Sequence, residues 1–506
     1  MLRAAAALLL ATSLAFAGAP IVCDDDGVWP VSAGHVPPAV DEYIRSLGNA
    51  RFDQRVACAK WAGNFTSRHE RAAGNAAAGD KALPASLILF SASGIRPRQF
   101  VDWLKQTGYV RHIEQARHFV VARFSRYMPT HRLVDLLESP QIAYAEPDCD
   151  GPDFLTTSVT PDLSQTVESN CWQRAARDTF PNDPCMDELW GHTKIGWDSS
   201  VAARSLPRIV AVLDSGIDAS HEDLSFAVML RMNAHEPARS QGSYLNAKCA
   251  TSGRCYPHGT EMAGTIGGRM DNGIGVAGVA PNSRLLPIVI SRIDRGLLGK
   301  LSTIAEGIDA AVLDDADVIN ISAKWPVDSR AISESIRAAV GGDQASKRLI
   351  VTGYATSLDA DDSVREYFPS RYRCLAGVIA AVPADMRGHD LFNPKSRPNA
   401  TDGRIQAPGV DIVVTTTENS ERGYALSGAA GASSAAAYVS GAVALIWGSP
   451  PLNKCDAQQI KQLLFCRSKS SDSTRYPWVH VDFLRELSHL GAGADCRAAM
   501  EALGCS

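Results

Sequence analysis

Two hydrophobic patterns divide the chain into two structured regions. Between residues 84 and 150, short apolar or alternating runs are separated by stretches with the apolar spacing of helices. From residue 182 to about 490, the apolar runs become continuous and rich in β-branched residues, as in parallel strands buried on both faces. These runs are RIVAVLD (208–214), RLLPIVI (284–290), DVINIS (317–322), RLIVTG (348–353) and GVIAAV (377–382). Helical stretches between several of them, such as 303–316, predict an α/β fold with a doubly wound, mostly parallel sheet.

The first region predicts a compact β-α-β-α-β module. Its strand-like runs are SLILF (86–90), HFVVARF (118–124) and IAYAEPD (142–148), and its helical runs are 97–108 and 129–140. The first helical run begins with proline and ends at glycine, which are ordinary start and stop signals. This order of elements favours a small α+β domain of the ferredoxin-like type.

The remaining segments indicate how the chain is processed and connected. An early arginine, an apolar run and a small-x-small pattern that ends at Ala17 predict a secretory signal peptide. No later apolar run reaches the ~18 residues that span a bilayer, so we expect a secreted, soluble protein. The expected organisation is a signal peptide (1–17), an N-terminal segment and linker (18–83), the small domain (84–150), an exposed connector (151–181), the large domain (182–490) and a cysteine-containing tail (491–506).

Charge and cysteine content narrow the function classes. A formal net charge of −5 gives no basic footprint for nucleic acid or an anionic membrane. Twelve cysteines are an even number and fit an oxidising compartment. Their spacing suggests the pairs Cys249–Cys255 and Cys496–Cys505, although sequence alone leaves the connectivity open.

Three short segments carry the chemistry. Asp214 ends the first buried strand of the large region, His258 opens the helical run HGTEMAGTIGG, and Ser433 lies in the small-residue run before the helix expected at 438–447. An acid, a base and a hydroxyl in the chain order Asp, His, Ser are the parts of a hydrolase triad. They point to amide or ester cleavage through an acyl-enzyme.

Each of the three has an ordinary structural explanation when it is taken alone. Asp214 could be a strand-end carboxylate satisfied by loop amides, and His258 a packed or capping histidine. Ser433 could be a helix N-cap, with Ser427 or Ser434 equally eligible. Their joint occurrence in one order favours the catalytic interpretation.

The larger context strengthens this interpretation. The motifs LDSGID, HGTEMAGTI, DNGIGVAGVAP (271–281), DVINIS, APGVDI (407–412) and GASSAAAYVSGAVALI (431–446) resemble those of the subtilisin family of serine proteases (subtilases, peptidase S8). The likeness covers about 182–490, and the upstream module, which ends in QIAYAEPD, resembles the inhibitory prodomain of the family. It implies a subtilisin-like fold and a secreted serine endopeptidase made as a zymogen.

The resemblance implies roles for single residues. Ser433 would be the nucleophile, His258 the general base and then acid, and Asp214 its orienting carboxylate. The backbone N–H of Ser433 would be one donor to the oxyanion of the reaction.

It also implies a substrate track and a set of partners. Ser322, Ala323, Lys324 and the stretch around Gly299 would flank an extended peptide as added strands. Expected partners are protein or peptide substrates and the chain's own prodomain, with no nucleic acid and a monomeric state. No cofactor is required, and structural calcium is left open because no Asp-rich loop of the EF-hand type occurs.

The chain departs from the family pattern at two places around the nucleophile. The family usually reads Gly-Thr-Ser-Met-Ala-x-Pro, whereas residues 431–437 read Gly-Ala-Ser-Ser-Ala-Ala-Ala. The oxyanion Asn of the family follows a strand that resembles 348–353, but residues 351–368 contain no Asn. Tyr354, Thr356 and Ser357 are candidate substitute donors, and none is preferred. Losing such a donor costs roughly 10²–10³ in kcat, a magnitude measured in subtilisin itself.

These departures leave two functional hypotheses open. The first is a working, slow or narrow protease, and the alternative is a pseudoprotease kept as a binding or scaffold protein. An esterase or lipase is disfavoured because the Gly-x-Ser-x-Gly elbow is absent around Ser433. Lys324 stands where the family usually has Gly, so its side chain is expected to narrow the main specificity site or to favour an acidic substrate residue.

Overall fold

A six-stranded parallel sheet forms the centre of the larger region in the computed structural model. Its strand order is β16-β15-β12-β11-β7-β8, and every neighbouring pair is parallel. The strands are β7 (Ile209–Asp214), β8 (Arg284–Val289), β11 (Val318–Ile321), β12 (Leu349–Gly353), β15 (Val378–Ala384) and β16 (Arg404–Pro408). The prediction of a mostly parallel α/β fold is therefore confirmed. The residues described are 23–24, 27–28, 86–124, 136, 139–148, 170–229, 257–292, 297–298, 300–325, 329–341, 347–358, 364–389, 403–416, 423–427, 431–469, 476–490 and 493–505.

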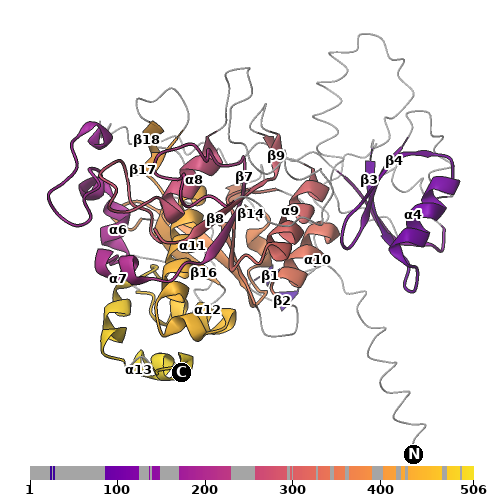
Figure 1. Cartoon of the computed structure of the whole chain (residues 1–506). Helices are drawn as coiled ribbons and strands as arrows, with labels where there is room; N and C mark the ends of the chain where they lie inside the picture. The colour runs from indigo at the N-terminus through magenta and orange to yellow at the C-terminus, as the bar shows by residue number, and fades with distance from the viewer. Residues whose placement is uncertain are drawn as a thin grey trace, which may run out of the picture.

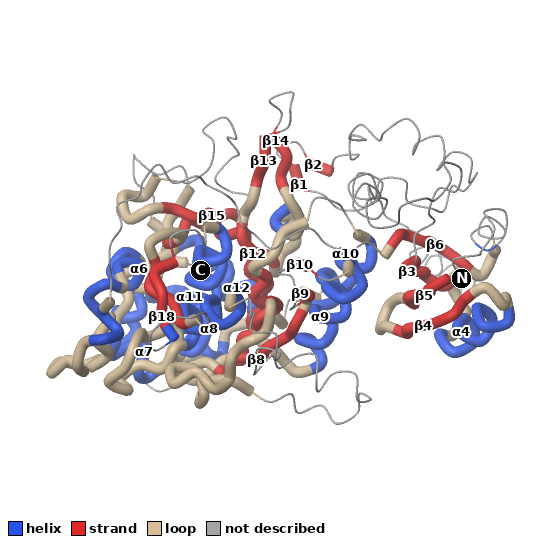
Figure 2. The backbone as a smooth tube through the Cα atoms, turned by 90° about the horizontal axis from the view of Figure 1, so that it is seen from above, coloured by secondary structure: helices blue, strands red, loops and turns tan. Residues whose placement is uncertain are grey.

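Helices cover both faces of this sheet (Figures 1 and 2). On β7, Val210 and Val212 pack in one cluster with helices α8 (His258–Gly267) and α11 (Ala432–Gly448). The alternate residues Ala211 and Leu213 pack in a second cluster with α9 (Leu301–Leu313) and α10 (Arg330–Ala339). Because successive side chains of a strand point to opposite faces, a strand covered on both faces is apolar throughout.

The central helix α11 is longer than the sequence predicted. It begins at Ala432, six residues before the expected start at 438, and all of its residues are buried. The extra turns consist of Ala and Ser, whose small size lets this end of the helix lie close to the sheet. A helix buried on every side carries no polar face, so its beginning has no amphipathic signal.

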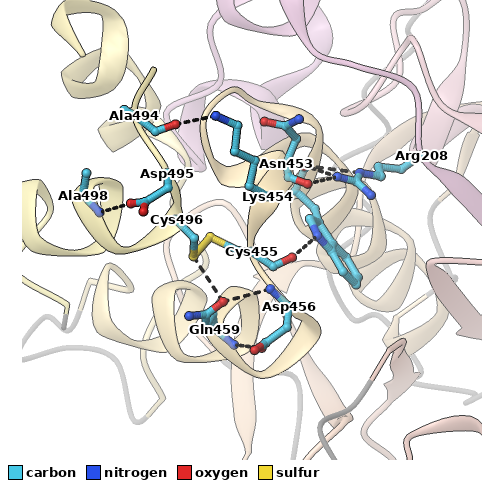
Figure 3. Close-up of a disulfide and its surroundings, with 11 residues drawn as sticks. Arg208, Asn453, Lys454, Cys455, Asp456, Gln459, Ala494, Asp495, Cys496 and Ala498 are labelled. Carbon is cyan, nitrogen blue, oxygen red and sulfur yellow. Dashed lines mark hydrogen bonds between the residues drawn. A yellow bond between two sulfur atoms is a disulfide. The ribbon is translucent and has the colours of Figure 1, made fainter. Parts of the chain in front are cut away.

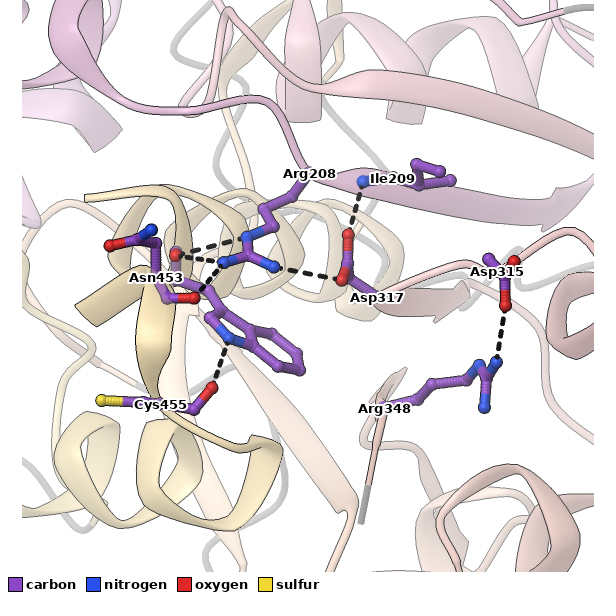
Figure 4. Close-up of polar contacts among 8 residues, drawn as sticks. Arg208, Ile209, Asp315, Asp317, Arg348, Asn453 and Cys455 are labelled. Carbon is purple, nitrogen blue, oxygen red and sulfur yellow. Dashed lines mark hydrogen bonds and ion pairs between the residues drawn. The ribbon is translucent and has the colours of Figure 1, made fainter. Parts of the chain in front are cut away.

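A polar cluster fixes the edge of the sheet opposite to Asp214 (Figure 4). Arg208 precedes β7 and donates to the carbonyls of Trp447 and Asn453, each at 2.9 Å, and it contacts Asp317 at 3.3 Å. Asp317 also accepts from the N–H of Ile209 at 2.9 Å. The amino-terminal ends of β7 and β11 are thus tied to the end of α11.

Two disulfides attach the C-terminal helix α13 (Cys496–Ala502) to α12 (Ala457–Cys466). They join Cys455 to Cys496 (Figure 3) and Cys466 to Cys505. The predicted pair Cys496–Cys505 is wrong, because roughly 10 Å of helix separates these residues and a disulfide spans less than about 7 Å between Cα atoms. A third disulfide joins Cys171 to Cys185. The suggested pair Cys249–Cys255 lies outside the described residues.

The small module folds as a four-stranded antiparallel sheet with one described helix. The elements are β3 (Ser86–Ser91), α4 (Pro97–Gln106), β4 (Val110–Gln115), β5 (Val120–Phe124) and β6 (Ile142–Pro147), and the strand order is β4-β5-β3-β6. The predicted β-α-β-α-β plan missed β4. This strand lies at the edge of the sheet and has no fully buried residue, so its sequence VRHIEQ lacks an apolar run. The predicted helix at 129–140 lies mostly outside the described residues, and the ferredoxin-like assignment stays a prediction.

Two acidic side chains of this module contact the N-termini of α9 and α10. Glu146 of β6 accepts from the N–H groups of Arg330 at 2.9 Å and Ala331 at 3.2 Å, at the start of α10. Asp148 accepts from the N–H of Ser302 at 3.1 Å, at the start of α9. Carboxylates at helix N-termini satisfy unpaired N–H groups and interact favourably with the helix dipole. Figure 1 shows the module beside these two helices.

Smaller elements complete the described part of the chain. They are β1 (Cys23–Asp24), β2 (Gly27–Val28), α6 (Trp190–Lys194), α7 (Ser199–Arg204), β9 (Ser291–Arg292), β10 (Leu297–Leu298), β13 (Thr356–Leu358), β14 (Val364–Glu366), β17 (Ile412–Thr415) and β18 (Tyr424–Ser427). Among the described helices, none combines the length and apolarity that crossing a bilayer requires.

Candidate active site

Asp214 and His258 form a buried pair at the carboxyl end of β7. His258 Nδ1 lies 2.9 Å from both carboxylate oxygens of Asp214. Asp214 is fully buried and His258 is 7% exposed. A buried carboxylate that accepts from imidazole Nδ1 fixes the tautomer of the ring and leaves Nε2 to act as a base.

Gly259 allows this close approach. A Cβ on Gly259, the residue after His258, would collide with the carbonyl oxygen of Gly216 and crowd Asp214. The N–H of Gly259 also donates to Ser215 Oγ at 3.0 Å, and Asp214 Oδ1 accepts from the N–H of Ser215 at 2.7 Å. The segments Asp-Ser-Gly (214–216) and His-Gly (258–259) therefore pack directly against each other.

The pair changes the basicity of His258. Burial by itself lowers the pKa of the imidazole, because it disfavours the charged form. The charge and hydrogen bond of Asp214, with a smaller contribution from Glu261, outweigh burial and raise the pKa above the usual value for histidine. The imidazolium that forms when the ring takes up a proton is thus stabilised.

Ser433 lies in the first turn of α11, next to the strand that neighbours β7. Its Oγ donates to the carbonyl of Ser322 at 3.5 Å, and Ser322 Oγ donates to the carbonyl of Ser433 at 3.3 Å. Ser322 follows β11, where Ile321 is in register with Leu213 of β7. Asp214 and Ser433 therefore meet at the same edge of the sheet. Within the described part of the chain, the Ser433 hydroxyl has no hydrogen bond to His258, and such bonds are often long or unformed before substrate binds.

A chain of buried polar groups holds the backbone of Ser433. Ser440 Oγ donates to Asn320 Oδ1 at 2.9 Å, and Asn320 Nδ2 donates to Ser322 Oγ at 2.9 Å. Asn320, Ser322 and Ser440 are fully buried. Sequence reasoning missed this role of Asn320, although a polar residue inside the apolar run DVINIS was the signal that could have indicated it.

The start of α11 supplies one donor for an oxyanion. As the second residue of the helix, Ser433 has a backbone N–H with no acceptor inside the helix. Gly431 precedes the helix with φ 47°, a left-handed conformation that favours glycine. A Cβ on Gly353, at the end of β12, would come within 2.7 Å of the Ala432 carbonyl oxygen. The strand end and the helix start therefore touch directly.

Tyr354 follows Gly353, and its side chain is directed to another part of the molecule. It is 2% exposed, packs with Ala380, Val382 and Tyr476, and lies 4.7 Å from the guanidinium of Arg404. Burial raises the pKa of its hydroxyl. The Tyr354 side chain thus packs on the face of β15 that carries Ala380 and Val382, opposite to the face that packs against α11. The side chains of Thr356 and Ser357, the other candidate donors, lie outside the described residues.

The predicted substrate residues are only partly described. Ser322 and Ala323 are fully buried, whereas Lys324 is half-buried with its Nζ 4.9 Å from the ring centre of Tyr367. Gly299 lies outside the described residues. Nothing in the sequence indicated Tyr367, because this contact joins segments that are 43 positions apart.

The described acidic residues do not fit a metal site. Among them and the described His and Cys residues, no group of three or more is arranged to hold an ion. Asp223, buried near Asp183, is occupied by protein donors: Asn272 Nδ2 at 2.7 Å, the N–H of Val276 at 3.0 Å and the Tyr424 hydroxyl at 2.9 Å. The Asp223 carboxylate is therefore used by hydrogen bonds within the protein.

Comparisons with known proteins agree with this geometry. The model of the subtilase family (peptidase S8) matches residues 208–477. Subtilisin of Bacillus pumilus is 32% identical over 48% of this chain and 77% of its own length. Subtilisin E of Bacillus subtilis is 31% identical over 48% of this chain, and the match covers just over half of that relative, 56%.

A solved structure shares the fold. The keratinolytic, subtilisin-related enzyme fervidolysin of Fervidobacterium pennivorans superposes with a TM-score of 0.56 over 81% of this chain and 62% of its own, at 22% identity. The family match, the sequence relatives and the parallel sheet with its buried Asp–His pair agree on one assignment. The chain belongs to the subtilase family, the subtilisin-like serine proteases.

Proposed function

We propose that the protein is a serine endopeptidase that is secreted as a zymogen and cleaves peptide bonds through an acyl-enzyme on Ser433. The observation that carries the proposal is the buried Asp214–His258 contact of 2.9 Å, at the sheet edge where Ser433 also lies. Membership of the subtilase family supports the reaction class. The three disulfides between described cysteines support an oxidising, secretory environment.

Each residue has a distinct task in the proposed mechanism. A rotation about χ1 moves Ser433 Oγ from the Ser322 carbonyl towards His258 Nε2. The oxygen then attacks the scissile carbonyl carbon while Nε2 takes its proton. Asp214 stabilises the imidazolium, and the N–H of Ser433 donates to the oxyanion. His258 next protonates the leaving amine, and water hydrolyses the acyl-enzyme by the reverse proton path.

The missing Asn sets the expected rate. Only one oxyanion donor, the N–H of Ser433, can be named among the described residues, since the Tyr354 side chain packs elsewhere. Loss of one donor is worth about 2.7–4 kcal/mol in kcat, against the 8–23 kcal/mol that enzymes typically remove from a barrier. We therefore expect a slow enzyme rather than an inactive one.

The contacts of the small module support the zymogen. Glu146 and Asp148 satisfy the N-termini of two helices of the large domain, and Lys300 donates to Ser86 at 2.7 Å across the same boundary. A module attached through charged helix caps can stay bound after the connector at 151–181 is cut. It would then act as a prodomain that must be released before substrate enters.

A processing experiment tests the proposal. Residues 18–506 are expressed beside the Ser433→Ala variant, and the products are sized by mass spectrometry. We expect the wild-type chain to be cut within 149–181 and the variant to stay intact. A wild-type chain that stays full length at several pH values, or a variant that is cut equally fast without added protease, would favour the pseudoprotease.

A further inference from the structure

Among the half-buried lysines of the described chain, three donate to an oxygen of the protein and Lys324 does not. Lys194 donates to the Met386 carbonyl, Lys300 to Ser86 and Asp148, and Lys461 to the carbonyls of Leu375 and Val378. Lys324 is also half-buried, yet no described oxygen accepts from its Nζ and no described carboxylate lies within ion-pair distance. Burial without such a partner lowers the pKa of its ammonium. An ammonium in this position is stabilised when an anion arrives.

The position of this lysine places it beside the nucleophile. The carbonyl of Ser322 accepts from Ser433 Oγ. Lys324 is two residues after Ser322, so the Cα atoms of Ser322 and Lys324 lie within roughly 7 Å of each other. Between Ile321 and Trp325, every other side chain is buried. Lys324 is therefore the one side chain of this stretch that reaches the surface next to the reacting hydroxyl.

The side chain of Lys324 packs against the ring of Tyr367. Its Nζ lies 4.9 Å from the ring centre of Tyr367, a cation–π contact. The following residue, Trp325, exchanges two backbone hydrogen bonds of 2.9 Å with Phe368, the residue after Tyr367. The N–H of Tyr367 donates to the carbonyl of Ala355 at 2.9 Å. Both partners of the cation–π contact are thus anchored by backbone bonds.

The described carboxylate next to Tyr367 in the chain is already in use. Glu366 precedes Tyr367, but its oxygens contact Arg373 Nη1 at 2.6 Å, Arg404 Nη2 at 3.5 Å and Ser370 Oγ at 3.1 Å. Two buried guanidinium groups share this single carboxylate. The charge of Glu366 is therefore already compensated by arginine.

From these contacts we propose that Lys324 binds a carboxylate of the substrate, so that the enzyme prefers Asp or Glu immediately before the scissile bond. The inference rests on the proposed function and deepens it by naming the substrate class. A carboxylate that pairs with this ammonium gains a charge-assisted hydrogen bond that the neutral amide lacks. We expect kcat/KM for a Glu substrate to exceed that for the matched Gln substrate by about tenfold or more, which corresponds to about 1.4 kcal/mol or more.

The test compares two chromogenic peptides that differ only in Glu or Gln before the cleaved bond, with the processed wild-type enzyme. Lys324→Met removes the charge at similar length, and Lys324→Arg retains it. We expect a kcat/KM ratio of Glu to Gln of about ten or more for the wild type and the arginine variant. The ratio should fall to about one for the methionine variant.

Labelling by a fluorophosphonate separates the two ways in which this test can fail. A labelled enzyme with equal rates on both peptides, or a methionine variant that keeps the preference, would overturn the role of Lys324 alone. An enzyme that neither cleaves nor labels would overturn the proposed function and this inference with it.

Discussion

At the scale of single residues, the site depends on what is small as much as on what is reactive. Gly259 lets His258 reach Asp214, and Gly353 lets the end of β12 touch the turn that presents Ser433. Ser440 and Asn320 hold the hydroxyl of Ser322, which in turn donates to the carbonyl of Ser433. A larger residue at Gly259 or Gly353 would displace these elements, even though Asp214, His258 and Ser433 would all still be present in the sequence.

The raised pKa of His258 predicts the acid side of the activity profile. The ring acts as a base only when it is neutral, so activity is lost as the pH falls through its pKa. Because Asp214 raises that pKa, the acid limb of kcat/KM should lie above the usual range of histidine. Asp214→Asn should move the limb to lower pH and reduce kcat, on the order of 10⁴-fold. A limb that is unmoved in this variant would contradict the account.

The lowered pKa of Lys324 predicts the alkaline side of the substrate preference. The ammonium is present below its pKa and is lost as the pH rises through it. The preference for Glu over Gln should therefore decline at a lower pH than an exposed lysine would give. Lys324→Arg should keep the preference at that pH, because arginine stays charged. A decline at the same pH in both proteins would show that another group titrates.

At the scale of elements, the starts of four helices hold the residues of the proposed chemistry and of the proposed regulation. The start of α8 presents His258, and the start of α11 presents Ser433, whose first-turn N–H has no acceptor inside the helix. The starts of α9 and α10 are satisfied by Asp148 and Glu146 of the small module. Functional side chains thus occur at places where backbone donors need partners.

Removing one of these caps should loosen the module. Glu146→Gln loses the charge at the start of α10 and places an amide near its N–H groups, which should cost about 1–2 kcal/mol, or roughly 5–30-fold in retention. The full chain is processed, and the fraction of module that stays bound is measured by gel filtration. Glu114→Gln is the matched control, since Glu114 contacts His112 and Arg123 within the module. Equal retention of both variants would argue against the cap.

Elements and site differ in how far the sequence could predict them. Five of the six strands of the parallel sheet were predictable, because a continuous apolar run is local information, whereas β16 (RIQAP) is buried without such a run and was missed. The motifs around Asp214, His258 and Ser433 are local too, and the catalytic roles of these residues stay a prediction. The edge strand β4 was missed, since an edge needs no apolar run. The Lys324–Tyr367 contact, the packing of Tyr354 and the cap at Glu146 were missed because each joins segments far apart in the chain.

At the scale of the whole molecule, cross-links secure the end of the chain that lies away from the proposed catalytic residues. The disulfides Cys455–Cys496 and Cys466–Cys505 attach α13 to α12, and Lys454 donates to the Ala494 carbonyl at 2.6 Å beside the first of them (Figure 3). This end of the large domain is thus held by two disulfides and by the ion pair of Arg208 with Asp317. Neither feature contacts Asp214, His258 or Ser433.

This separation predicts a change of stability without a change of chemistry. Cys466→Ser with Cys505→Ser opens a loop of 39 residues, which should lower stability by about 2–4 kcal/mol. The melting temperature should fall, while kcat/KM at 25 °C should stay within a factor of about two. An unchanged melting temperature would mean that this cross-link adds nothing to the fold.

If Asp214 and His258 activate the hydroxyl of Ser433, this hydroxyl should react covalently with a phosphorus electrophile. The processed protein is treated with a fluorophosphonate, and the modified residue is located by peptide mass spectrometry. We predict a single adduct on Ser433, its loss in Ser433→Ala and a strongly reduced labelling rate in His258→Ala. A protein that stays unlabelled across the pH range, or that labels equally fast without His258, would contradict the account.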